Sequence, residues 1–261
     1  MEILCIGDVC GPAGCEALKR HLPHLKKQYN ADLTIVNGEN GADGNGITPH
    51  TAEIIFNYGA DIITGGNHSL KREEIKSALE NNPCLLRPHN LPDCDFGSGY
   101  TLFDMGKYRV AVINLLGTAY LEKQKAENPF TAANVLIEKA KSDGANAVIV
   151  DFHAEATGEK RAFGFFVDGR VSAVFGTHTH VQTADAQILP LGTGYITDVG
   201  MVGAKDSVLG VKKEIIIKRM SEKNMQKFEF ATGECIICGC VFSVNTATGK
   251  TEKVQSFCVN G

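Results

Sequence analysis

The chain has 261 residues, of which 43% are hydrophobic and 21% are charged. This composition is typical of a folded globular protein with one sizeable core, and it excludes an extensively disordered chain. The formal net charge of −4 argues against a broad basic surface for nucleic acid, and no stretch approaches the roughly 18 apolar residues of a membrane span. The first residues read as a strand rather than a signal peptide, so we expect a cytoplasmic protein.

Strands and helices alternate over the first two thirds of the chain. A helix is predicted at residues 14–29, where leucines recur every three or four positions and Pro23 predicts a kink or the start of a second helix. Another helix, at 48–58, has Thr48 as its N-cap and Gly59 as its stop. The other elements predicted here are strands at 2–7, 33–37, 61–64, 109–115, 147–152 and 171–175, and helices at 72–81 and 131–142.

Beyond Gly194 the pattern is mostly β, with strands predicted at 213–219, 236–244 and 253–258. An N-terminal part with alternating strands and helices, followed by a β-rich C-terminal part, predicts two packed sheets flanked by helices. No internal repeat or long linker divides the sequence. We therefore expect a single domain over residues 1–261.

The nine cysteines predict reduced thiols rather than a disulfide framework, because their number is odd, most are scattered and no secretion signal is present. Cys235, Cys238 and Cys240 form a C-x-x-C-x-C cluster that could bind zinc or iron. This cluster lies in a predicted strand, where cysteine acts as a small buried apolar residue. A zinc site of this type would also need a second pair of ligands, so the structural interpretation is favoured.

Several predicted strands end in a loop that begins with a side chain able to bind a metal, and glycines in most of these loops allow the backbone to turn sharply. In α/β sheets, functional groups collect at the carboxyl ends of the strands, so these side chains are expected to meet in one crevice. The candidates are Asp8, Glu39, Asn40, Asn67, His153, His178 and His180.

This set predicts a centre of two metal ions. It is too large for one closed zinc site, and it suits two ions bridged by a carboxylate, which can clamp the attacking and leaving oxygens of a phosphoryl transfer. The mixture of nitrogen and oxygen ligands, with no obvious thiolate, favours Mn, Fe or Zn over copper, calcium or an iron–sulfur cluster.

Each candidate also has an ordinary structural interpretation. Asp8 alone is more often a turn residue or helix cap, Asn40 and Asn67 alone are usually turn formers, and His153 alone could be a hydrogen-bonded histidine at a strand end. The coincidence of compatible ligands at separate strand ends favours the metal centre.

The order Gly-Asp, Gly-Glu-Asn, Gly-Asn-His, lone His and Gly-Thr-His-Thr-His resembles that of the calcineurin-like metallophosphoesterases, and more closely their YmdB-type branch. The likeness covers nearly the whole chain, including residues 37–48 (NGENGADGNGIT), 151–160 (DFHAEATGEK), 176–185 (GTHTHVQTAD) and 197–201 (TDVGM). It implies a four-layer α-β-β-α sandwich, the calcineurin-like phosphoesterase fold. It also implies a phosphodiesterase acting on small cyclic nucleotides, including 2′,3′- and 3′,5′-cyclic monophosphates.

The resemblance also implies how the ligands are divided. One metal would be held by Asp8, Glu39, Asn40 and His180, and the other by Asn67, His153 and His178, with Glu39 bridging the two. The wider superfamily usually has a histidine where this chain has Cys10. Asn40 is expected to replace that ligand, with Cys10 as a minor alternative.

His68, next to Asn67, is the predicted catalytic residue. It would stabilise charge on the phosphoryl oxygen or protonate the leaving ribose oxygen, while a metal-bound hydroxide attacks phosphorus. Relatives often carry an aromatic and an acidic residue after Gly-Asn-His, whereas this chain has Ser69, Leu70 and Lys71. The group that orients His68 must therefore come from elsewhere.

Two other functions compete with this one: a phosphomonoesterase or 5′-nucleotidase with the same metals, and a non-catalytic regulatory or RNA-associated binding protein. The expected partner is a small cyclic nucleotide. No membrane partner is expected. A nucleic-acid or RNA-processing partner stays open, although charge does not indicate one, and a homo-oligomer is a general expectation. The pattern does not choose among Fe, Mn and Zn, nor does it select the physiological nucleotide.

Overall fold

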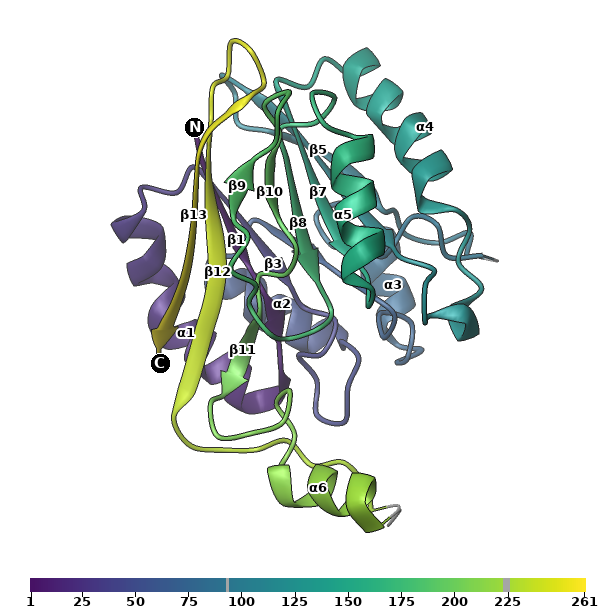
Figure 1. Cartoon of the computed structure of the whole chain (residues 1–261), viewed down its shortest axis with the longest axis vertical. Helices are drawn as coiled ribbons and strands as arrows, with labels where there is room; N and C mark the ends of the chain where they lie inside the picture. Colours follow the sequence, from purple (N-terminus) through teal and green to yellow (C-terminus); the bar gives the residue numbers. More distant parts are fainter. Residues whose placement is uncertain (93, 223–225) are drawn as a thin grey trace.

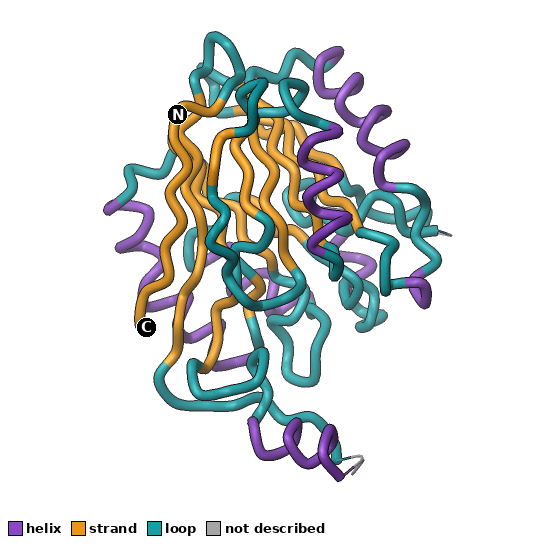
Figure 2. Tube along the Cα trace, viewed as in Figure 1, coloured by secondary structure: helices purple, strands orange, loops and turns teal. Residues whose placement is uncertain are grey.

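Two β-sheets lie face to face, and helices cover the outer face of each (Figure 1). The computed structural model describes residues 1–92, 94–222 and 226–261. In Figure 2 the strands, in orange, occupy the middle of the molecule between helices in purple. Helix α6 is an exception, because it projects from the lower end of the molecule in both views.

The first sheet has the order β2-β11-β12-β1-β3-β4, with β13 paired to β12. In it, β1, β3 and β4 run parallel. Its strands are β1 (Glu2–Ile6), β2 (Asp8–Val9), β3 (Leu33–Asn37), β4 (Ile62–Thr64), β11 (Met201–Ala204), β12 (Cys235–Val244) and β13 (Thr251–Asn260). Helices α1 (Gly11–Gln28), α2 (Pro49–Asn57) and α3 (Ile75–Asn81) pack on its outer face.

The second sheet has the order β5-β6-β7-β8-β10-β9, in which β6, β7, β8 and β10 run parallel. Its strands are β5 (Tyr100–Asp104), β6 (Arg109–Leu116), β7 (Ala147–His153), β8 (Ala173–Thr177), β9 (Gln187–Ile188) and β10 (Gly194–Ile196). Its outer face is covered by α4 (Pro129–Ser142) and α5 (Thr157–Phe166), and a short 3₁₀ turn, Glu122–Gln124, precedes α4.

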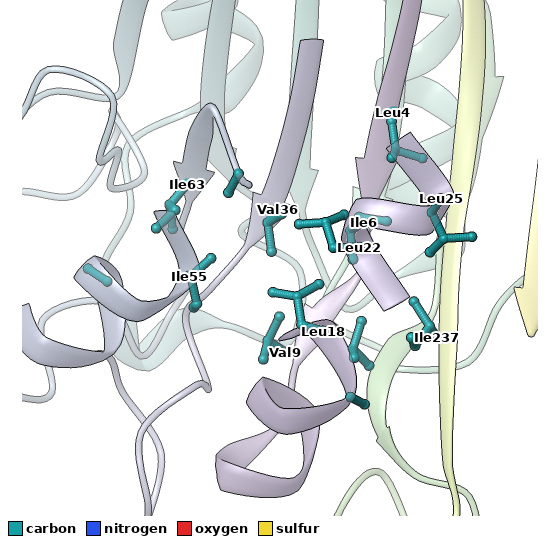
Figure 3. Close-up of a cluster of buried hydrophobic side chains, with 14 of the residues drawn as sticks. Leu4, Ile6, Val9, Leu18, Leu22, Leu25, Val36, Ile55, Ile63 and Ile237 are labelled. Atoms are coloured by element: carbon teal, nitrogen blue, oxygen red, sulfur yellow. The ribbon is translucent and has the colours of Figure 1, made fainter. Parts of the chain in front are cut away.

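Three clusters of buried apolar side chains fill the spaces between these layers. Strand side chains alternate between the two faces of a sheet, so Leu4 and Ile6 of β1 pack against α1, where Leu18 and Leu22 meet them (Figure 3). A second cluster fills the space between the other sheet and α4 and α5. The third lies between the sheets, where Ile3 belongs to the same cluster as residues of β6 to β8. These layers confirm the predicted α-β-β-α sandwich.

Most predicted elements are present with shifted ends. The Thr48 hydroxyl accepts a hydrogen bond from the Thr51 amide, as expected of an N-cap, and Gly59 has a φ of +113°, which suits the end of the helix. Helix α1 runs unbroken through Pro23, so the expectation of a second helix is wrong. Its buried leucine stripe holds the helix on the sheet despite the hydrogen bond that proline cannot donate.

The predicted strand at 213–219 is wrong, because these residues belong to α6 (Lys213–Glu222). Three consecutive isoleucines suggested a strand, since β-branched residues favour extended backbone. The segment projects beyond both sheets, however, and a strand there would have no neighbouring strand with which to pair (Figure 1). As a helix it buries Ile215 and leaves Ile217 58% exposed.

The expectation of reduced thiols is wrong for Cys238 and Cys258, which form a disulfide between β12 and β13. The two residues are direct partners in the antiparallel register, with Cα atoms 4.1 Å apart. The sequence does not reveal this register. Cys235 and Cys240 are free and belong to different apolar clusters, on opposite faces of β12. The C-x-x-C-x-C segment is therefore part of the packed sheet and not a gathered metal site.

Within residues 1–92, 94–222 and 226–261, no helix has both the length and the hydropathy that crossing a bilayer would require.

Candidate metal centre

The predicted site residues meet at the carboxyl ends of the parallel strands of both sheets. Asp8 is the first residue of β2, and His153 is the last residue of β7. The others lie in the loops just after β3, β4 and β8. These are Glu39, Asn40, Asn67, His68, His178 and His180.

The buried carboxylate of Glu39 lies at the centre of this cluster. Its Oε1 is 3.4 Å from His153 Nε2 and accepts a hydrogen bond of 2.8 Å from the Asn40 amide. Its Oε2 accepts the backbone N–H of His68 at 2.9 Å. Burial disfavours the charged carboxylate, but His153 and His68 outweigh that effect and hold the pKa of Glu39 well below its usual range. Glu39 is therefore a carboxylate at neutral pH.

The carboxylate of Asp8 is incompletely satisfied. Its Oδ2 accepts the backbone N–H of His178 at 3.1 Å, whereas its buried Oδ1 accepts no hydrogen bond from the residues that the structure describes. Oδ1 lies 3.8 Å from both His153 Nδ1 and His180 Nε2. Burial raises the pKa of Asp8, against the opposing effect of His180 and His153. A cation beside Oδ1 would supply the missing partner.

Electron-pair donors also converge around His153. His178 Nδ1 lies 3.0 Å, and the side-chain oxygen Oδ1 of Asn67 lies 2.9 Å, from His153 Nε2. Burial, and then the neighbouring His153, lower the pKa of His178 to about 3, so its imidazole is neutral at pH 7. Ligand atoms of Glu39, His153 and His178 all lie within 4.8 Å of one another. The donor set therefore fits a transition-metal centre.

The loop that carries His178 and His180 has a strained backbone and a buried support. The two histidines have φ values of +100° and +63°, which cost energy in any residue with a Cβ. Beneath them, the Lys160 ammonium lies 2.7 Å from the Asp198 carboxylate, and both side chains are buried. The same carboxylate accepts the Thr179 N–H at 3.0 Å, so the pair fixes the loop between the histidines.

A hydrogen-bonded relay orients His153. Its Nδ1 lies 2.9 Å from the Thr177 hydroxyl, which donates a 2.7 Å hydrogen bond to Asp151. Asp151 also accepts hydrogen bonds from Asn37 and Thr64 on the opposing sheet. With Nδ1 held by this relay, the Nε2 atom of His153 faces Glu39, Asn67 and His178. Such outer partners commonly fix the ring orientation of metal-binding histidines.

Comparison with known proteins places these features in a family. A family model described as YmdB-like protein matches residues 4–257. The chain belongs to the YmdB-like family. It is 44% identical over 260 residues to a protein of Bacillus subtilis (strain 168) named 2′,3′-cyclic-nucleotide 2′-phosphodiesterase, and the alignment covers 100% of this chain and 97% of that relative.

Two solved structures share the whole fold of this YmdB-like chain. The crystal structure of a novel phosphatase from Mycoplasma pneumoniae has a TM-score of 0.94 and 37% sequence identity, and the match covers 100% of this chain and 93% of that one. A hypothetical protein from Thermus thermophilus has a TM-score of 0.92 and 34% identity, with coverage of 100% and 99%. The family resemblance and the fold inferred from the sequence are confirmed.

His68 of this YmdB-like chain is oriented by its own neighbours in the cluster. Its Nδ1 lies 2.9 Å from Asn40 Oδ1 and 3.3 Å from Glu39 Oε1. The amide of Asn40 donates to Glu39, which makes its Oδ1 the acceptor. Two acceptors therefore face Nδ1, so this nitrogen carries a hydrogen and Nε2 is left for another partner. Asn40 and Glu39 therefore orient the His68 ring, although no acidic residue follows His68 directly in the sequence.

All eight predicted site residues belong to this cluster, whereas several of its other residues were missed. Glu155, which lies 2.9 Å from His178 Nε2, is one of those missed. Cys10, named above as the minor alternative to Asn40, has its Sγ 3.4 Å from His180 Nδ1. A cavity of about 250 Å³ borders the cluster. Its wall includes Leu209, Val211, Phe228 and Phe230, from the segment between β11 and β12. The motif DFHAE gave a signal for Glu155, but nothing in the sequence marked the apolar wall.

Proposed function

We propose that this chain hydrolyses small cyclic nucleotides, 2′,3′-cyclic and also 3′,5′-cyclic monophosphates, at a centre of two metal ions. The observation that carries the proposal is the central, buried Glu39 carboxylate, surrounded by two groups of nitrogen and oxygen donors. The 44% identity to a relative named 2′,3′-cyclic-nucleotide 2′-phosphodiesterase supports a hydrolase of phosphodiester bonds.

We assign the ligands as the family resemblance implies. Asp8, Asn40 and His180 would hold one ion, and Asn67, His153 and His178 the other, with Glu39 between them. The unsatisfied Asp8 Oδ1 supports the first group, and the convergence of Asn67 and His178 on His153 supports the second. Fe, Mn or Zn bound there would activate water and neutralise charge on the phosphoryl group.

His68 would act on the substrate through Nε2. Its Nδ1 is held by Asn40 and Glu39, which fixes the plane of the ring. The side chain is 32% exposed and lines the cavity, so Nε2 can meet a substrate oxygen. Donation of a proton from Nε2 to the departing ribose oxygen would turn a poor leaving group into an alcohol.

The competing phosphomonoesterase function uses the same centre, and the similar Mycoplasma pneumoniae structure is described as a phosphatase. A cyclic substrate differs from a linear monophosphate by one ester bond and one negative charge. Parallel assays with 2′,3′-cyclic AMP and with 3′-AMP therefore separate the two functions. Faster turnover of the linear compound would favour the phosphomonoesterase.

The decisive experiment measures hydrolysis of 2′,3′-cyclic AMP after chelation and after Mn²⁺ is added back. We expect activity to vanish on chelation and to return with the metal. Asn67→Ala removes one proposed ligand and should lower restored turnover roughly 100-fold or more. Asn134→Ala, at an exposed position of α4, is the matched control and should behave as wild type. Turnover that survives chelation would contradict the metal-dependent mechanism.

A further inference from the structure

The cavity beside the metal cluster has a polar floor and an apolar wall. His68, His178 and His180 contribute to the floor, while Phe228 and Phe230 contribute to the wall. The two aromatic residues follow α6 in the chain, in the segment that leaves the first sheet after β11 and returns at β12 (Figure 1). Phe228 is 43% exposed, so part of its ring is open to a ligand.

A second cavity, of about 210 Å³, continues from the first along the same wall. Asn45, Val211, Phe228 and Phe230 line both cavities. The second cavity is also lined by Lys71 and Lys227. Together the cavities form a groove that begins at the metal cluster and extends past the two phenylalanine rings. A phosphoryl group at the cluster would therefore leave room for the rest of a nucleotide along the wall.

The wall is held in place by its own contacts. The guanidinium of Arg219, on α6, lies over the Phe228 ring at 4.5 Å from its centroid. The Phe230 ring packs so closely on Gly11 and Gly210 that a Cβ at Gly11 would overlap it. The carbonyl of Leu209 lies 3.0 Å from His180 Nδ1, which ties this segment directly to the cluster. The rings of Phe228 and Phe230 are thus held in place next to the cluster where the phosphoryl group of a substrate would bind.

From this geometry we infer that Phe228 and Phe230, with Val211 and Asn45, form the nucleobase subsite of the enzyme. The inference rests on the proposed phosphodiesterase function and names the part of the substrate that this wall binds. Any nucleobase presents a flat π-face that can stack on an aromatic ring. The side-chain amide of Asn45 offers both a donor and an acceptor to the edge of the base. The wall therefore selects nucleotides over phosphodiesters that lack a base.

The test compares 2′,3′-cyclic AMP with 1-O-methylribose 2′,3′-cyclic phosphate, which has the same reacting group and no base. We expect the wild-type Mn²⁺ enzyme to prefer the nucleotide in kcat/KM. Phe228→Ala should reduce that preference roughly tenfold or more, through KM, and Phe228→Tyr should keep it. Met220→Ala removes an 80% exposed apolar side chain of α6 that lines neither cavity, and it should match wild type. An equal preference in wild type and Phe228→Ala overturns the inference.

Calorimetric titration with adenosine separates this inference from the proposed function. We expect adenosine to bind the wild-type Mn²⁺ enzyme and to lose most of its affinity in Phe228→Ala. If adenosine binds in a Phe228-dependent manner but no phosphodiester is hydrolysed, the proposed function is wrong and the nucleobase subsite is supported. Hydrolysis of the phosphodiester, with neither adenosine binding nor a preference for the nucleotide, would support the proposed function and overturn the nucleobase subsite.

Discussion

His68 combines a fixed ring with an accessible nitrogen, and this combination predicts a catalytic rather than a structural effect of its removal. Its Nδ1 is bound to Asn40, while its side chain is 32% exposed at the cavity. In His68→Gln the amide can hydrogen-bond but cannot deliver a proton. We expect kcat for 2′,3′-cyclic AMP to fall by about 10² to 10⁴, with metal content, measured by plasma mass spectrometry, unchanged.

The control for this prediction is His50→Gln, at an exposed position of α2. It should leave both kcat and metal content at wild-type values. If His68→Gln retains full turnover, the proton-donor role is wrong. If it loses metal, His68 acts as a ligand or as a support of Glu39.

At the level of elements, the loop between β4 and α3 depends on the absence of a side chain at Gly66. A Cβ at this position would overlap both Glu39 Oε2 and His153 Nε2. Gly66→Ala should therefore displace one of these groups and weaken metal binding by about 10- to 100-fold. Equilibrium dialysis with Mn²⁺ measures this effect directly.

Gly158, in α5, provides a matched control, because a Cβ there meets no other atom within 4 Å. Gly158→Ala should leave metal affinity unchanged and raise the free energy of unfolding by up to about 1 kcal/mol, since alanine favours the helix. Equal metal affinities of the two alanine variants would contradict the steric argument.

Helices and strands were predictable where the residues of the segment itself, such as capping residues, determine its structure. Thr48 and Gly59 mark the ends of a helix, and both have the expected role in α2. The three isoleucines before Lys218 carried a misleading signal, because β propensity is realised only where a neighbouring strand is available. The Cys238–Cys258 pairing depends on a register that is set by the whole sheet.

The candidate site was predictable to the extent that its residues follow strand ends. Glu39 and Asn67 lie beside His153, more than 80 positions away, because parallel strands bring their carboxyl ends together. Phe228 and Phe230 follow a helix that was predicted as a strand, so their position against the cavity had no basis in the pattern. The roles of the site residues stay predictions until variants are measured.

At the scale of the whole molecule, Asp151 joins the two sheets. It belongs to β7 of the second sheet and accepts hydrogen bonds from Asn37 of β3 and Thr64 of β4 in the first sheet. The contact lies beside the apolar cluster between the sheets. This shared core, together with the Asp151 contact, supports our proposal that residues 1–261 form one domain.

Burial of Asp151 raises its pKa from 3.8 to about 6, against the opposing effects of His153 and its hydrogen-bond donors. The folded state thus binds the proton more tightly than the unfolded state. The associated stabilisation is present below pH 4 and is lost as the pH rises to about 6, by up to roughly 3 kcal/mol. In Asp151→Asn this contribution is absent. Urea unfolding of the chelated protein at pH 4, 5 and 6 should show wild type losing stability relative to the variant.

Asp104→Asn, which replaces an exposed carboxylate of β5, is the control for this pH dependence. Its free energy of unfolding should follow the wild-type curve across the same range. Parallel curves for wild type and Asp151→Asn would show that the buried carboxyl does not retain its proton in the folded protein.

The segment at residues 205–234 leaves and re-enters the first sheet at adjacent points. Ala204 of β11 and Cys235 of β12 are direct partners in the antiparallel register, and the Lys205 N–H donates to the Glu234 carbonyl just beyond them. The segment is thus an enlarged hairpin loop, and such loops tolerate changes of length at small cost in stability. This loop can therefore be exchanged between relatives while the strands that present the proposed metal ligands stay intact. A graft must keep an acceptor at the place of the Leu209 carbonyl, which lies against His180. Within that constraint, substrate preference set by the proposed nucleobase subsite could change independently of the proposed metal centre.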